Sequence, residues 1–180
     1  SPIVVNGRVF LTAAIDPEHD APAGMAVGVR DPSTMGKGAK PERELKYQLS
    51  CRDLADGSVL WKQDVGSGVP QYAVHRSNTF ATESPASDGE RVFVTFGALG
   101  ALVAYDLDGE EQWRVETGVY PTGNNFGWGI SLVAQDGLVF LQNDNEESSF
   151  LAAFDAETGE ERWRAKRGRG TSWGTPAVIE

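Results

Sequence analysis

The stretch Asp155-Ala156-Glu157-Thr158-Gly159-Glu160-Glu161-Arg162-Trp163 decides how this chain folds, because the same arrangement occurs twice before it. Each copy has an acidic residue, a short polar turn, a glycine and then a strand that carries a tryptophan. The tryptophans lie about 50 residues apart, a period typical of one supersecondary unit repeated along a chain. The repeated frame consists of Asp53, Gly57 and Trp61, of Asp106, Gly109 and Trp113, and of Asp155, Gly159 and Trp163.

The rest of each copy predicts three further β-strands. A hairpin turn, Asn6-Gly7 in the first copy, precedes a strand with Val and Phe in fixed columns, as in Val92-Phe93. A third strand ends at the frame aspartate, as in Leu151 to Asp155. Cys51 stands in the column that Ala104 occupies in the second copy, so we expect a packed small side chain rather than a nucleophile. Four short antiparallel strands are the composition of a β-propeller blade.

The repeat predicts an all-β fold, a single partial β-propeller over 1-180 with about three four-stranded antiparallel blades. Blade 1 covers about 1-66, and a long loop rich in Pro, Gly and charge is inserted in it at about 13-46. Blade 2 covers about 84-118 and blade 3 about 129-168. The residues 175-180 predict the first strand of a fourth blade.

The composition restricts the partners of the chain. With 26 acidic and 16 basic residues the net charge is -10, which disfavours binding to nucleic acid or to an anionic membrane. No apolar run reaches the roughly 18 residues of a membrane-spanning helix. The lone cysteine, Cys51, cannot form an internal disulfide. The chain starts at Ser1 without a methionine, so we expect that it has been trimmed and that a signal peptide or anchor is missing from it.

Four signatures of the repeat resemble those of the PQQ-like (quinoprotein-type) β-propeller family. They are Ser-Pro opening a blade, Gly-x-Val-Phe in its second strand, Leu-x-Ala-x-Asp in its third and Thr-Gly-Glu-x-x-Trp in its fourth, as in Leu151 to Trp163. The family includes BamB-like outer-membrane assembly lipoproteins, quinoprotein dehydrogenases and sensor ectodomains, so the fold alone does not choose a function. Since propellers have about 4 to 8 blades, the resemblance implies a fragment of a longer ring, or a chain completed by partners or by itself.

A quinone-dependent dehydrogenase needs a cofactor pocket, a Ca²⁺ ion held by oxygen ligands and a carboxylate base. Alcohol-oxidising members of the family resemble one another in stacking the quinone beside a disulfide of adjacent cysteines, and this chain has one cysteine. The acidic turn at 143-147 offers Asp144, Glu146 and Glu147 as metal candidates, but without a recognised ligand spacing. We therefore expect no cofactor and no metal. PQQ and Ca²⁺ are an alternative that this stretch does not support.

The linkers between the blades predict a binding surface, because they gather at one end of a propeller around its central channel. Their planar and amide side chains suit a peptide or a sugar, and the candidates are His75, Arg76, Asn124, Asn125, Trp128 and Trp173. An alternative interpretation is structural. Trp128 and Trp173 recur once per blade, as packing residues do, and His75 would then hydrogen-bond within its own turn.

These features favour a non-enzymatic binding or scaffold module, exported from a bacterial cytoplasm and periplasmic or secreted. Its export is implied by the resemblance and by nothing in the composition. The expected partner is a protein, peptide or saccharide at the face of the linkers, with no nucleic acid and no membrane insertion. The alternatives are part of a PQQ- and Ca²⁺-dependent quinoprotein dehydrogenase and a ligand-sensing ectodomain of a membrane-anchored signalling protein. Open strand edges also predict self-association.

Overall fold

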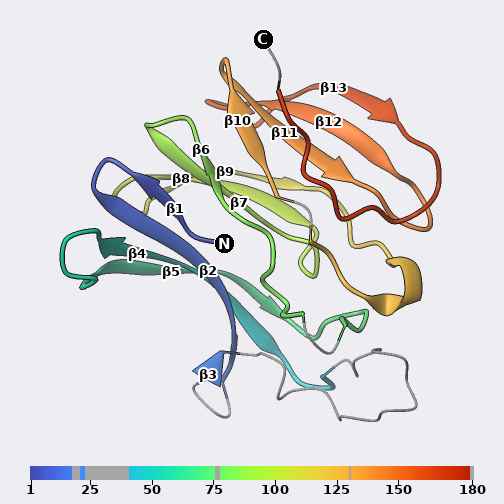
Figure 1. The fold of residues 1–180 in the computed structure, drawn as a ribbon, viewed down its shortest axis with the longest axis horizontal. Helices are drawn as coiled ribbons and strands as arrows, with labels where there is room; N and C mark the ends of the chain where they lie inside the picture. The colour runs from blue at the N-terminus through green and yellow to red at the C-terminus, as the bar shows by residue number, and fades with distance from the viewer. Residues whose placement is uncertain (18–20, 23–40, 76–77, 130, 179–180) are drawn as a thin grey trace.

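The fold is all-β, as the repeat predicts, and consists of three antiparallel sheets (Figure 1). A computed structural model describes residues 1–17, 21–22, 41–75, 78–129 and 131–178 of the chain. Among these residues the helical structure is limited to a short 3₁₀ turn, η2 (Gly123–Asn125). None of the described helices is long and apolar enough to cross a membrane.

Each sheet is a blade of four strands that follow one another along the chain. Blade 1 contains β1 (Ile3–Val5), β2 (Arg8–Asp16), β4 (Leu45–Asp53) and β5 (Val59–Gly68), and β3 (Ala21–Pro22) pairs with the end of β2. Blade 2 contains β6 (Ala86–Ser87), β7 (Arg91–Phe96), β8 (Ala101–Asp106) and β9 (Glu111–Glu116). Blade 3 contains β10 (Val133–Gln135), β11 (Leu138–Asn143), β12 (Phe150–Asp155) and β13 (Glu161–Lys166). Figure 1 shows the blades side by side in chain order.

The strands of blade 1 extend into the stretch where we predicted an inserted loop, about 13-46. β2 continues to Asp16, and its register places Ala14 opposite Tyr47 in β4. Both side chains are buried, so the pairing is stabilised by the core beyond the point where the sequence pattern weakens. Arg43 donates a hydrogen bond from Nε to Asp16 at 2.9 Å where β2 ends. The predicted loop was therefore too long at both ends.

The end of the chain carries no strand in the described residues. Residues 171–178 have no strand assignment, and residues 179–180 lie outside the described part. A strand is stabilised by hydrogen bonds to a paired neighbour, and the next strand of a further blade would be that neighbour. The first strand of a fourth blade at 175-180 stays a prediction.

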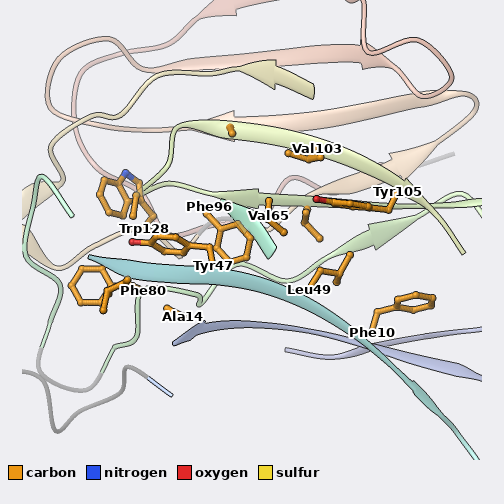
Figure 2. Packing of buried hydrophobic residues seen from close by; sticks show 14 of the residues in the cluster. Phe10, Ala14, Tyr47, Leu49, Val65, Phe80, Phe96, Val103, Tyr105 and Trp128 are labelled. Atoms are coloured by element: carbon orange, nitrogen blue, oxygen red, sulfur yellow. The ribbon is translucent and has the colours of Figure 1, made fainter. Parts of the chain in front are cut away.

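Each blade has two faces, because successive side chains of a strand point to opposite sides. We call the face toward the following blade the front face and the other the back face. The front face of blade 1 and the back face of blade 2 enclose one apolar cluster, which includes Phe10, Leu49, Val94, Val103 and Tyr105 (Figure 2). The front face of blade 2 and the back face of blade 3 enclose a second, which includes Phe93, Leu102, Trp113, Leu141 and Phe154.

The frame tryptophan of blade 1 lies on the glycine turn of blade 2. Trp61 Nε1 donates a hydrogen bond to the Leu107 carbonyl at 3.0 Å. The Trp61 ring occupies the space beside Gly109, where an added Cβ would lie 2.9 Å from it. Arg8 strengthens the same contact through an ion pair with Asp108 at 3.0 Å. Blade 1 is thereby fixed to one turn of its neighbour.

Blades 2 and 3 are joined in the same way. Trp113 Nε1 donates to the Ala156 carbonyl at 3.0 Å, and a Cβ on Gly159 would lie 2.7 Å from the Trp113 ring. Gly159 also has a φ of +74°, in the left-handed region that favours glycine. We call this arrangement of ring, carbonyl and glycine the Trp–Gly joint.

In the described residues, the tryptophan of blade 3 and the glycine turn of blade 1 each lack the partner that completes a Trp–Gly joint. Trp163 of blade 3 is 41% exposed, whereas Trp113 is 9% exposed. Gly57 of blade 1 has a positive φ, +75°, as its counterparts do, but nothing lies within 4 Å of an added Cβ. The neighbouring Leu54 is 53% exposed.

The frame aspartates close the turns that carry these glycines. Asp53 Oδ1 accepts the Ala55 N–H at 2.7 Å, and Asp155 Oδ1 accepts the Thr158 N–H at 2.9 Å. The Arg162 guanidinium and the Thr158 N–H hold the pKa of the Asp155 carboxyl well below its usual value. Asp155 is therefore a structural carboxylate.

We expect Gly159→Ala to destabilise the protein more than Gly57→Ala. Both substitutions place a Cβ at a positive φ, which costs about 1–2 kcal/mol. Only Gly159→Ala also drives that Cβ into a tryptophan ring, and overpacking adds about 1–3 kcal/mol. Denaturant unfolding of the two variants measures the difference. Equal losses for the two would contradict a closely packed Trp–Gly joint.

Candidate functional site

The linkers after blades 1, 2 and 3 meet on one side of the molecule, where hydrogen bonds join them. The His75 N–H of the first linker donates to the Phe126 carbonyl of the second at 3.0 Å, and Asn78 Nδ2 donates to the same carbonyl at 3.0 Å. The third linker contacts the second through Trp173 Nε1, which donates to the Gly127 carbonyl at 2.8 Å. The three linkers therefore form one continuous surface.

Three rings, one from each linker, form a row on this surface, which we call the linker aromatic row: His75, Phe126 and Trp173. The His75 and Phe126 rings meet edge to face with centroids 4.9 Å apart, and the Phe126 and Trp173 centroids are 6.1 Å apart. Trp173 is 45% exposed, and the other two rings are partly buried. The structure thus brings together the predicted residues His75 and Trp173. It does so through Phe126, which was not among the predicted residues although it lies between the predicted Asn125 and Trp128.

The predicted residues Asn124 and Asn125 lie at an exposed tip beside this row. Their φ values are +54° and +55°, a conformation that Asn adopts more readily than other non-glycine residues. Neither side-chain amide hydrogen-bonds to another residue that the structure describes. Two amides are thereby presented to solvent next to the aromatic row. The predicted Arg76 lies outside the described residues.

Trp128 lies beneath this surface and not on it. It is 6% exposed and packs beside Phe96 and Tyr47 in the first core cluster (Figure 2). Its ring fills the space next to Gly97, where an added Cβ would lie 2.2 Å from the indole. This geometry supports the structural interpretation of Trp128.

Trp173 follows blade 3 as Trp128 follows blade 2, but blade 3 has a different residue at the position that corresponds to Gly97. The strand register aligns Gly97 with Asp144, because Phe96 and Asn143 are the last paired residues of β7 and β11. Asp144 is buried in an ion pair, with Arg167 Nε 2.6 Å from its Oδ1. With no glycine there, the Trp173 ring lies near Gly129 and remains half exposed.

The acidic turn of blade 3 uses its carboxylates to hold the third linker. Asp144 pairs with Arg167, and Glu146 Oε1 accepts the Thr171 N–H at 3.0 Å and the Thr171 hydroxyl at 2.6 Å. Glu147 is exposed. No group of three His, Cys, Asp or Glu side chains suited to a metal ion occurs among the described residues. These three metal candidates therefore do not converge on one point.

A buried carboxylate that the sequence reasoning missed lies at the start of blade 2. Glu83 is 4% exposed, and its Oε1 accepts the Gly97 N–H at 2.9 Å. Glu83 Oε2 and Trp128 Nε1 have no hydrogen-bond partner among the described residues. Glu83 and Trp128 line a cavity of about 20 Å³ together with Gln142 and Asn143. This volume is about that of one water molecule.

The surroundings of Glu83 change its protonation. Burial raises the pKa of the Glu83 carboxyl to about 7, although the Gly97 N–H acts in the opposite direction. Burial, with the charge of Glu83 added to it, also raises the pKa of the Tyr47 hydroxyl far above its usual value. No sequence pattern marks Glu83, because it is the fold that brings Gly97 and Trp128 around it.

The chain is similar in sequence to one described family. A family profile described as outer membrane protein assembly factor BamB matches residues 46–178. No curated protein matches the chain.

The solved structures that are similar to the chain in fold include two dehydrogenases and one BamB protein. Quinohemoprotein alcohol dehydrogenase from Comamonas testosteroni matches with a TM-score of 0.55 and 19% identity, over 92% of this chain and 20% of that chain. A europium-containing methanol dehydrogenase matches with a TM-score of 0.55 and 15% identity, over 92% of this chain and 24% of that chain. BamB from Moraxella catarrhalis matches with a TM-score of 0.51 and 17% identity, over 76% of this chain and 41% of that chain. The chain thus spans less than half the length of each. At such identities the likeness shows the fold alone.

We expect Glu83→Gln to remove a pH dependence of stability. The unfolded chain loses the Glu83 proton near the usual pKa of 4.5, whereas the folded chain keeps it up to about 7. The free energy of unfolding therefore falls by about 3 kcal/mol as the pH rises through this window. Denaturant unfolding at several pH values should show that this fall is present in the unsubstituted chain and absent in the variant.

Glu116→Gln is the matched control, since Glu116 is exposed at the end of β9. It should leave the profile unchanged. Parallel profiles for Glu83→Gln and the unsubstituted chain would show that Glu83 is ionised in the fold at neutral pH.

Proposed function

The chain belongs to the family of outer membrane protein assembly factor BamB, and from this premise we propose that it is a non-enzymatic binding or scaffold module, part of a longer β-propeller. The observation that carries the proposal is the linker aromatic row. It crosses three linkers, which hydrogen bonds join, and stands beside two exposed amides. Such a surface offers apolar rings and hydrogen-bonding groups to a partner.

The surface suits an extended segment of a partner protein. The half-exposed Trp173 ring provides a broad apolar contact, and tryptophan is enriched among the residues that dominate binding energy. The amides of Asn124 and Asn125 supply donors and acceptors for a peptide backbone. Aromatic rings and amides also suit the binding of a saccharide. We favour the peptide because the family is named for assembling proteins.

We place the module outside the cytoplasm, periplasmic or secreted. The support for this location is the family itself, whose description refers to the outer membrane. We also infer that further blades complete the ring. Three blades are fewer than the about 4 to 8 of closed propellers, and the chain covers 41% of the BamB structure.

A quinoprotein dehydrogenase is the second candidate, since two of the similar structures are dehydrogenases of alcohols. The described residues do not fit the cofactor. The cavity at Glu83 has about 20 Å³, whereas a pocket for a ligand of drug size has about 300–1,000 Å³. A groove of about 470 Å³ beside Arg52 is large enough, but no carboxylate of the part that the structure describes lines it. Cys51 is buried and has no second cysteine to pair with. No carboxylate group suited to Ca²⁺ occurs within the described ranges. We therefore derive no reaction step through a quinone.

We expect Trp173→Ala to weaken peptide binding by at least about tenfold, because it removes the most exposed ring of the row. The measurement is an NMR titration of the labelled protein with hexapeptides that alternate aromatic and polar residues. The Trp173 indole N–H and the side-chain amides of Asn124 and Asn125 should shift as the peptide binds.

Trp163→Ala is the control, because Trp163 is similarly exposed but belongs to β13 and not to a linker. It should leave peptide affinity unchanged. Peptides that cause no shift at the row would refute the peptide proposal. Maltose or cellobiose causing those shifts instead would reassign the surface to saccharides.

A further inference from the structure

Two buried polar atoms beneath the linkers lack a hydrogen-bond partner and belong to residues that line one cavity. Glu83 Oε2 and Trp128 Nε1 have no partner among the described residues, so they do not bond each other directly. The third such atom, the Tyr47 hydroxyl oxygen, belongs to a residue that does not line this cavity. We propose that the cavity is a binding site for one water molecule, which accepts the Trp128 N–H and donates to Glu83 Oε2, and so holds the second linker in place.

The cavity lies where blade 2, the second linker and blade 3 meet. Thr95 lines it from β7, and Gln142 and Asn143 line it from β11. These three residues are buried, as are Glu83 and Trp128. The cavity volume of about 20 Å³ exceeds the about 10–15 Å³ that one water molecule needs. The site is therefore formed by parts of the chain that the structure describes, and it has room for a single water molecule.

The two unpaired atoms require an occupant that both accepts and donates hydrogen bonds. The Trp128 indole N–H only donates, and an ionised Glu83 carboxylate only accepts. A cation offers the N–H no acceptor, and the carboxylate repels an anion. Water satisfies both atoms, and the side-chain amides of Gln142 and Asn143 offer it further partners. Because buried polar groups are costly when they are left unpaired, this pairing favours occupancy.

The bridging water completes the contacts that hold Trp128. The Trp128 carbonyl accepts the Thr82 hydroxyl at 2.9 Å, and the Trp128 ring fills the space next to Gly97. Glu83 contacts the same glycine, whose N–H donates to Glu83 Oε1 at 2.9 Å. The water thus joins two residues that Gly97 already positions, and Trp128 follows Phe126 of the linker aromatic row by two residues. The site does not depend on peptide binding, since it lies beneath the row.

Magnetisation transfer from water to the indole N–H groups of the ¹⁵N-labelled protein tests the proposal. The Trp128 N–H should show the nuclear Overhauser effect of a water molecule that stays bound for longer than the protein takes to tumble. The spectrum is recorded well above the Glu83 pKa of about 7, where the carboxyl carries no proton that could relay the signal. Trp113 is the internal control, because its indole is also buried but donates to the Ala156 carbonyl. No effect at Trp128 would overturn the site.

Two substitutions of Glu83 separate a bridging water from packing alone. Glu83→Met replaces the carboxyl by an apolar group of similar length and should abolish the effect. It should also make deuterium exchange of the Trp128 N–H at least about tenfold faster. The Trp173 indole signal should shift in this variant, since its N–H donates to the Gly127 carbonyl of the second linker. Glu83→Gln is the matched control and should keep both readouts, because water can accept from the amide and from the indole.

The remaining outcomes are also decisive. An effect that persists in Glu83→Met would show that a threonine hydroxyl relays the signal, and it would overturn the bridge. If Glu83→Met does not fold, the presence or absence of the effect in the unsubstituted chain decides. Trp173→Ala should keep the effect at Trp128 although it loses peptide binding under the proposed function. Failure of one proposal is thereby distinguishable from failure of the other.

Discussion

The Trp–Gly joint is the contact on which the rest of this fold depends. An indole ring and a backbone approach each other closely only where the backbone carries no side chain, so the joint requires glycine for space and for its positive φ. The backbone carbonyl of the same turn must point toward the indole N–H, and the frame aspartate stabilises the turn in this conformation. One contact thus accounts for the aspartate, the glycine and the tryptophan that recur in every blade.

Residues whose role repeats could be predicted from the sequence, because each blade applies the same local constraint. The frame residues and the column of small side chains at Cys51 belong to this class. Residues whose role depends on a neighbouring blade could not be predicted. Glu83 is buried by Gly97 and Trp128, which are distant in sequence, and no pattern near it indicates burial.

Trp128 and Trp173 show why equivalent positions acquire different roles. Both follow a blade and both precede a glycine, so the sequence gives no reason to separate them. Trp128 has Gly97 to pack on, whereas Asp144 occupies the corresponding place for Trp173. The indole that has a glycine to pack on lies in the core, and the one whose corresponding position is aspartate lies half exposed. In this chain, surface chemistry arises where the repeat is broken, in the linkers and not in the blades.

The agreement between strand order and chain order has a consequence for folding. In blades 2 and 3 each strand pairs only with the strands next to it along the chain, so their sheet contacts form between residues close in sequence, whereas in blade 1 β2 pairs with β4 across residues 17–44. Short contact separations favour fast folding, because little loop entropy is lost before a contact forms. Each finished sheet can then serve as the template on which the next one condenses, because the apolar face of a blade is buried only against its neighbour.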